Sequence, residues 1–405
     1  MNWAASNSSY VERDAEDRLR GFDDRAAVVK TTDRDGNIGT AIRRDYRDIA
    51  PLVRHRYEPA HPEVAAILTR PRDLHLTIDA RLQAEAARIV GRAAAATRSG
   101  RAAAVIMDAS TGEVLASVSY PFPEGELSRV TRRAGSAGTT DPLLDRARYG
   151  LYPPGSTFKL VTAAAALRQD PALSQQSFTC VRLDHSRVGA RIPGWSRPIR
   201  DDVKDSRPHG TISMREGMAQ SCNAYFANLA VQVGADGLAS TAAVAGIPLT
   251  APGTASLRDT LPHAGYGQGE VLATPLRMAR VAAAIASDGT LRDAAMVRGG
   301  SAAVATRFVP APAADRLAGY LRDAVVSGTG RLLKDHPGRI AGKTGTAVVD
   351  EAESHAWFVG FAPYGTAHRR IAFAVVIENA GYGGGVAASV AGHLVSAAAA
   401  AGYLR

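Results

Sequence analysis

Apolar residues recur at helical spacing between residues 78 and 98, after Pro71 and the segment 73–77. One side of this segment is expected to carry Leu82, Ala86, Ile89 and Val90. The spacing predicts an amphipathic helix over Ile78 to Arg98. We therefore expect the main domain to begin near residue 73.

Apolar runs of strand length form two groups that are far apart in the chain. They are 103–107, 113–118, 339–349, 355–362 and 371–378. Turn-forming residues at 108–112 separate the first two runs, which predicts a β-hairpin. The last three are joined by short polar connections and precede an Ala-rich segment that is expected to be helical.

The region between the two strand groups has helical patterning at 156–167, 214–233 and 275–287. Strands at both ends and helices in the middle predict an α+β domain. We expect a five-stranded, mainly antiparallel sheet that is flanked by helices and interrupted by a helical lobe.

Residues 1–72 mix both charge signs with scattered Gly and Pro and show little periodicity. We expect them to form a short N-terminal module, with residues 73–405 as the main domain. The first 20 residues lack the apolar core of a signal peptide. Residues 383–404 carry no Asp, Glu, Lys or Arg, but are mostly Ala, Gly and Ser, so a helix packed on the core is favoured over a membrane span.

The composition of the 405-residue chain, with 46% hydrophobic and 21% charged residues, is that of a globular protein. The formal charge of +9 comes from five lysines and 43 arginines against 39 acidic residues, without a dense basic run. Nucleic acid is therefore not an expected partner. Two cysteines, Cys180 and Cys222, are too few for a disulfide framework; a single bridge and two separate thiols both stay open.

Two of the five lysines lie in short polar motifs, which is informative because lysine, unlike arginine, can lose its proton when buried. Three motifs follow one another along the chain. They are Ser156-Thr157-Phe158-Lys159, Ser221-Cys222-Asn223 and Lys343-Thr344-Gly345-Thr346. Taken singly, each also occurs as a helix start, a local turn or a strand end, so the prediction depends on their occurring together.

The first motif has the composition of an activated nucleophile. Pro153-Pro154-Gly155 introduces a helix, so Ser156 lies in its first turn, where backbone N–H groups lack partners and can face an oxyanion. Lys159, three residues later, projects from the same face. A neutral Lys159, whose pKa is lowered by burial and by Lys343, can accept the Ser156 proton.

The other two motifs supply relay and binding groups for the same chemistry. Ser221 can pass a proton between Lys159 and a leaving nitrogen, and Asn223 can bind a substrate amide. Strand alternation places Thr344 and Thr346 on one face, where their hydroxyls can bind a carboxylate. Gly345 permits close backbone approach, and the Thr346 N–H can complete the oxyanion hole.

With these motifs, the chain resembles the class B, monofunctional penicillin-binding transpeptidases, which share a signature with class A β-lactamases. Further similar segments are 77–83, 154–159, 219–223, 265–269 with 274–275, and 355–362. The resemblance covers residues 73–405 and implies the β-lactamase/transpeptidase-like fold. It implies a peptidoglycan D,D-transpeptidase with some D,D-carboxypeptidase activity. In this reaction Ser156 attacks the D-Ala-D-Ala end of a stem peptide, releases D-Ala and passes the acyl group to an amine on a neighbouring strand. It also implies that β-lactam antibiotics acylate the same serine.

The resemblance also implies no cofactor, an extracytoplasmic location and cell-wall synthesis membrane proteins as partners. The family's membrane anchor is absent from this sequence, so we expect either an excised portion or an anchor on another chain. Residues 1–72 are too short for a glycosyltransferase domain and resemble a reduced N-terminal pedestal.

Other readings of the sequence stay open at this stage. A β-lactamase is disfavoured because the Glu-x-x-x-Asn element is missing between Lys159 and Ser221, where Glu216 is the only glutamate. A penicillin-binding sensor or scaffold with little turnover is disfavoured by the full set of chemical residues. The glycines at 265–269 are expected to form a turn rather than a phosphate cradle. His209, His355 and His393 lack metal-ligand spacing and are expected to be structural.

Overall fold

The computed structural model describes residues 15–23, 27–122, 142, 144–184, 186–249, 257–299, 304–349 and 352–404. The chain divides into two compact units. Residues 1–76 and 297–299 belong to the smaller unit, and residues 77–296 and 300–405 to the larger one. The three sequence motifs all lie in the larger unit.

In its described residues, the smaller unit contains a β-hairpin and short helices. The antiparallel strands are β1 (Ala27–Thr32) and β2 (Ile38–Arg43), and nearly all of their side chains are exposed. The helices are α2 (Glu16–Arg20), η1 (Arg47–Ile49), α3 (Ala50–Arg54) and α4 (Pro62–Leu68). Arg70 joins these pieces because its guanidinium pairs with Asp48 and donates to the Gly21 carbonyl.

A five-stranded antiparallel sheet forms the centre of the larger unit. Its order is β11 (Ala341–Val349), β12 (Ala352–Ala362), β13 (Ile371–Ile377), β3 (Ala102–Asp108) and β4 (Val114–Tyr120). The hairpin β3–β4 thus pairs with strands from the far end of the chain, through the register Val105 with Ala374. The predicted five-stranded sheet is confirmed, and its strands come from both ends of the domain.

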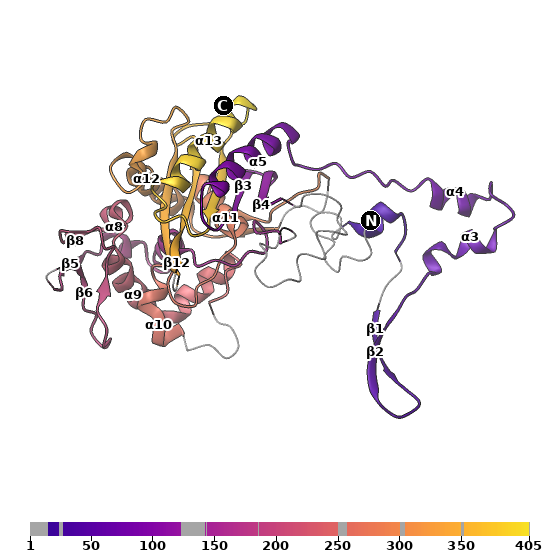
Figure 1. Cartoon of the computed structure of the whole chain (residues 1–405), viewed down its shortest axis with the longest axis horizontal. Helices are drawn as coiled ribbons and strands as arrows, with labels where there is room; N and C mark the ends of the chain where they lie inside the picture. The colour runs from indigo at the N-terminus through magenta and orange to yellow at the C-terminus, as the bar shows by residue number, and fades with distance from the viewer. Residues whose placement is uncertain are drawn as a thin grey trace. The chain divides into compact units, whose positions relative to one another are not determined.

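Helices cover both faces of this sheet (Figure 1). Helices α5 (Ala80–Ala95) and α13 (Val386–Ala400) pack on one face, where alternate residues of β3 such as Ile106 join their apolar side chains. Helix α11 (Pro275–Ala286) packs on the other face with the helical lobe, against residues such as Val105. This two-sided burial explains why the strand segments are almost entirely apolar.

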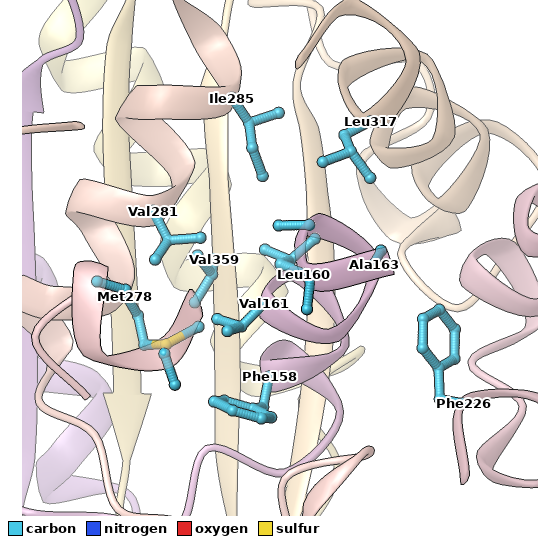
Figure 2. Close-up of a cluster of buried hydrophobic side chains, with 14 of the residues drawn as sticks. Phe158, Leu160, Val161, Ala163, Phe226, Met278, Val281, Ile285, Leu317 and Val359 are labelled. Carbon is cyan, nitrogen blue, oxygen red and sulfur yellow. The ribbon is translucent and has the colours of Figure 1, made fainter. Parts of the chain in front are cut away.

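The helical lobe lies between β4 and β11 in sequence. Its helices are η2 (Gly155–Phe158), α7 (Lys159–Gln169), η3 (Pro171–Gln175), α8 (Met214–Gln220), α9 (Asn223–Val244), α10 (Leu257–Ala264), α12 (Ala311–Val326) and η4 (Arg331–Leu333). Helix α7 is buried along most of its length. In Figure 2, its Leu160 and Val161 lie among apolar side chains from α11, α12 and β12. The first residues of α7 are therefore fixed by packing on several sides.

Two smaller sheets accompany the lobe. One has the order β7 (Ile199–Arg200), β6 (Val188–Ala190), β5 (Phe178–Arg182) and β8 (Gly210–Ile212), and the other pairs β10 (Ala305–Arg307) with β9 (Thr290–Arg292). Neither sheet was predicted from the sequence. Their strands have two to five residues, too few to give a period-2 signal.

The predicted helices are confirmed with one exception. Helix α5 begins after Asp79, whose carboxylate accepts from the Arg81 and Leu82 N–H groups. The C-terminal Ala-rich segment forms α13 on the core, and no helix in the described part of the chain is long and apolar enough to span a membrane. The continuous helix predicted for 214–233 is wrong, because Ser221 adopts a left-handed conformation and separates α8 from α9.

Candidate active site

A tight turn before α7 holds Ser156. Gly155 has φ +51°, and a Cβ there would lie 2.7 Å from the Thr346 carbonyl oxygen, so only glycine fits between this turn and β11. The Gly155 N–H donates to the Gly267 carbonyl at 3.1 Å. The glycine-rich segment 265–269 is thus a turn, as predicted, and it supports the turn that carries Ser156.

The second motif occupies the break between α8 and α9. Ser221 is the left-handed C-cap of α8 with φ 62°, and Cys222 caps the N-terminus of α9 through its sulfur, which accepts from the Tyr225 N–H at 3.3 Å. A positive φ at a non-glycine residue is strained and is maintained only where surrounding contacts require it. Here the strain turns the Ser221 carbonyl toward Lys159.

The Lys159 ammonium group lies among side chains of the first two motifs. Its Nζ is 2.9 Å from Ser156 Oγ, 2.5 Å from the Ser221 carbonyl oxygen and 2.7 Å from Asn223 Oδ1. A neutral amine has two hydrogens and one lone pair. It can therefore donate to the last two oxygens while it accepts the hydroxyl proton of Ser156.

Lys343 of the third motif contacts the second motif at Ser221. Its Nζ donates to Ser221 Oγ at 2.7 Å, and the same hydroxyl oxygen is 3.2 Å from Lys159 Nζ. Both lysine side chains are fully buried. Burial lowers the pKa of Lys159 to about 8, and burial together with the charge of Lys159 holds the pKa of Lys343 well below its usual range. Burial thus makes the neutral amine next to Ser156 far more populated than in a free lysine.

The hydroxyl groups of β11 contact two different segments, one after β13 and one after α12. Thr346 Oγ1 is 3.5 Å from the Gly383 nitrogen, and Thr344 Oγ1 is hydrogen-bonded to Thr329 Oγ1 at 2.6 Å. A Cβ on Gly345 would lie 2.8 Å from the Thr157 side chain, so the absence of a side chain at Gly345 admits the turn that carries Ser156. All eight predicted site residues therefore come from three segments that meet around Ser156.

Trp357 is a supporting residue whose contact sequence reasoning missed. Its side chain is fully buried, and its indole N–H donates to the Pro153 carbonyl at 3.0 Å. This bond fixes the chain just before Ser156 from the neighbouring strand β12. No local pattern could reveal it, because the two residues are 204 positions apart.

Asp201 links the small sheet to the second motif and was also missed. Its Oδ1 accepts from the Asn223 N–H and, at 3.2 Å, from the Ala224 N–H at the start of α9. Its Oδ2 lies 3.0 Å from Cys180 Sγ and 3.3 Å from Cys222 Sγ. The Asp201 carboxylate therefore holds the backbone of Asn223 in position.

His209 completes a group of four potential metal ligands with these residues. Its Nδ1 is 3.4 Å from Asp201 Oδ2, and the ligand atoms of Cys180, Asp201, His209 and Cys222 all lie within 4.8 Å of one another. Both cysteines are free thiols. The sequence spacing of His209 did not reveal this cluster, because the fold brings its members together from separate segments.

This donor set fits a tetrahedral Zn²⁺, for which two thiolates, one imidazole and one carboxylate are suitable ligands. Ligand atoms around such an ion are about 3.3–3.8 Å apart, close to the present separations. His209 Nε2 is 3.8 Å from Asp205 Oδ2, the kind of carboxylate partner that zinc-bound histidines commonly have. Four protein ligands would leave no open position, so an ion here would be structural.

The fold and the site together define a serine acyl-transferase with a lysine next to its nucleophile. The model of the penicillin binding protein transpeptidase domain matches residues 102–396. The chain belongs to this family.

Individual relatives agree with this assignment. The chain is 30% identical over 338 residues to the peptidoglycan D,D-transpeptidase PbpA of Mycolicibacterium smegmatis, with 74% of this chain and 67% of the relative covered. It is 28% identical to the peptidoglycan D,D-transpeptidase MrdA of Acinetobacter baumannii, covering 93% of this chain and 62% of the relative. The crystal structure of PBPA from Mycobacterium tuberculosis superimposes with a TM-score of 0.69 at 25% identity, covering 92% of this chain and 96% of that chain. The predicted family and fold are confirmed.

Proposed function

We propose that this protein is a peptidoglycan D,D-transpeptidase that cross-links stem peptides through an acyl-enzyme on Ser156. The observation that carries the proposal is the position of Lys159 Nζ, 2.9 Å from Ser156 Oγ and 3.2 Å from Ser221 Oγ. One amine can thus serve both the attacking and the departing group. Two relatives are peptidoglycan D,D-transpeptidases, which supports peptidoglycan stem peptides as the substrate.

In the acylation half-reaction, Ser156 Oγ attacks the carbonyl carbon of the penultimate D-Ala, and its proton passes to neutral Lys159. The carbonyl electrons move to oxygen, which accepts from the N–H groups of Ser156 and Thr346. The C–N bond then breaks, and the leaving D-Ala nitrogen takes a proton from Ser221 Oγ. Lys159 returns a proton to Ser221, so the enzyme ends as a neutral ester.

In the second half-reaction, an amine on a neighbouring stem peptide attacks the ester carbon. Its proton returns along Ser221 and Lys159 to the Ser156 oxygen as the C–O bond breaks. Thr344 and Thr346 hold the terminal carboxylate of the donor, and Asn223 binds an amide of the donor backbone. Lys343 orients Ser221 by donating to its Oγ.

A β-lactam is expected to acylate Ser156 and to leave slowly. Glu216 does not serve as the base for a hydrolytic water, because its carboxylate caps α8 by accepting from the Ser213 N–H at 2.8 Å and from Ser213 Oγ at 2.9 Å. A solved penicillin G acyl-enzyme of penicillin-binding protein A from M. tuberculosis has a TM-score of 0.68 to this chain at 25% identity. That protein forms an acyl-enzyme with penicillin G, which supports acylation of this chain by β-lactams.

The remaining assignments follow from the same proposal. Residues 73–405 form the transpeptidase domain, and residues 1–72 form a reduced pedestal or linker. The protein acts on the extracytoplasmic face of the membrane, where peptidoglycan is built, and its partners are membrane proteins of cell-wall synthesis. One structural neighbour comes from a peptidoglycan synthase complex, with a TM-score of 0.67.

The proposal is tested with a synthetic peptide ending in D-Ala-D-Ala and an isotopically labelled D-amino acid as acceptor. We expect labelled exchange product with the wild type and none with Ser156→Ala. A fluorescent penicillin is expected to label the wild type stably. Release within seconds would indicate a β-lactamase, and no labelling at all would indicate a non-catalytic scaffold.

A further inference from the structure

Two histidines and a glutamate occur at regular spacing in the loop between α3 and α4. His55, Glu58 and His61 follow one another at every third position. Their ligand atoms all lie within 4.8 Å of one another. Imidazole nitrogens and carboxylate oxygens are ligands for divalent transition-metal ions. The loop therefore brings together three donors of the kind that such an ion binds.

Two consecutive tight turns place these side chains on one side of the loop. The Glu58 N–H donates to the His55 carbonyl and the His61 N–H donates to the Glu58 carbonyl, both at 2.8 Å. Bonds of this kind join residues three positions apart, so every third side chain projects in the same direction. Pro59 and Pro62 follow two of the donors and restrict the backbone there. The backbone thus holds the three donors close together.

The surroundings of His55 match those of a metal-bound imidazole. Its Nδ1 lies 3.7 Å from Glu58 Oε1, and its Nε2 lies 3.4 Å from Glu63 Oε2. An ion between Nδ1 and Glu58 leaves the imidazole proton on Nε2, where it is directed at Glu63. Metal-bound histidines commonly donate their other N–H to a carboxylate, which fixes the orientation of the ring. His55 therefore has both the ligand neighbour and the supporting carboxylate that a metal site needs.

His61 completes the set after a small rotation. Its ring is stacked on that of His55, with the centroids 3.5 Å apart and 8° between the planes. The nitrogen lone pairs of parallel rings do not meet at one point, so one ring must turn about its Cβ–Cγ bond, a torsion with broad minima. His61 Nδ1 accepts from the Glu63 N–H at 3.3 Å, a long and exposed hydrogen bond that an ion and a water molecule can replace.

The smaller unit has little apolar core to hold its helices together. Among its described residues, the buried apolar side chains are Val64 and Ile67, both on α4. Small units with so little core are commonly stabilised by a metal ion or by disulfides. His55 is the C-cap of α3 and His61 is the N-cap of α4. One ion held by both histidines would therefore tie the end of α3 to the start of α4.

We propose that His55, Glu58 and His61 bind one divalent transition-metal ion that fixes the joint between α3 and α4. The donor set contains no thiolate, which suits ions such as Ni²⁺ or Cu²⁺ with water in the remaining positions. It differs in this respect from the cluster around Cys180 and Cys222, which lies in the larger unit. The inference is independent of the proposed function.

Trypsin reports on this site because Arg56 lies between two of the ligands and is exposed together with Tyr57. The full chain, freed of metal by dialysis against a chelator, is digested with and without NiCl₂. Cleavage of the Arg56–Tyr57 bond is followed by mass spectrometry, and cleavage after the exposed Arg34, in the turn between β1 and β2, corrects for any effect of Ni²⁺ on trypsin. We expect saturating Ni²⁺ to slow cleavage after Arg56 about tenfold or more and to leave cleavage after Arg34 unchanged.

Variants separate a built site from adventitious binding. The ratio of the rates with and without Ni²⁺ is taken for each variant, so a change in the loop itself does not affect the comparison. His55→Ala and His61→Ala should abolish the protection, and Glu63→Gln should raise the Ni²⁺ concentration for half-protection about tenfold. His75→Ala, which alters an exposed histidine of the same unit, is the matched control and should keep full protection. Equal cleavage after Arg56 with and without Ni²⁺ in the wild type, or protection that persists in His55→Ala, would overturn the metal site.

Discussion

Replacement of Lys159 by methionine tests the assignment of the base. Methionine approximates the length of the lysine stem but cannot accept a proton. We expect acylation of Ser156 by benzylpenicillin to slow by about 10²- to 10⁴-fold, the usual contribution of a general base. The loss leaves the Ser221 carbonyl and Asn223 Oδ1 without this donor, which costs about 1–3 kcal/mol of stability.

The pH dependence of the wild type follows from the lowered pKa of about 8 for Lys159. The neutral amine is the active form, and its fraction rises as the pH passes upward through that pKa. About a tenth of the molecules carry neutral Lys159 at pH 7 and about nine tenths at pH 9, so acylation accelerates about tenfold over this range.

Stopped-flow measurement of acylation from pH 6 to pH 10 provides the assay, with the exposed Lys334→Met as the control. The wild type and the control should show the same inflection, and Lys159→Met should show a flat profile. A Lys159→Met variant that retains the inflection, or that acylates within about tenfold of the wild-type rate, would refute the role of Lys159 as base.

Further predictions concern the supports of the site. Gly155→Ala would place a Cβ 2.7 Å from the Thr346 carbonyl oxygen at a residue with positive φ. We expect the free energy of unfolding in urea to fall by at least about 1–2 kcal/mol. An unchanged urea midpoint would show that alanine fits at this position without strain. Trp357→Phe removes the indole N–H that donates to the Pro153 carbonyl. We expect the free energy of unfolding in urea to fall by about 1–3 kcal/mol, and the acylation of Ser156 by benzylpenicillin to slow. Added Zn²⁺ should raise the Tm of the wild type but not of His209→Ala in calorimetry; no shift in the wild type would exclude zinc binding by the cluster.

Much of the fold could be predicted because the strands of the large sheet are buried on both faces. Short, continuous apolar runs flanked by turns, such as 371–377, predict buried strands. The order of the strands, with β13 beside β3, carries no local signal. This order was not predicted from the sequence.

The break at Ser221 shows where local patterning fails. The surrounding residues favour a continuous helix, and nothing in the sequence indicates a left-handed serine. The conformation is maintained by Lys159 and Lys343, which contact Ser221 from other parts of the chain. Tertiary contacts outweigh helix propensity at this position.

The grouping of Cys180, Asp201, His209 and Cys222 could not be predicted for a related reason. Their sequence separations of 8 to 42 positions follow no metal-binding motif, and the short strands that bring them together gave no signal. The three catalytic motifs could be identified because each keeps its chemical residues within four positions.

The most direct test of the central claim is the intact mass of the protein after treatment with benzylpenicillin, followed by peptide mapping of the adduct. We predict a single covalent adduct on Ser156, which persists over minutes and is absent from Ser156→Ala. An adduct on another residue, or no adduct on a folded wild-type protein, would show that the three motifs do not form a serine acyl-transfer site.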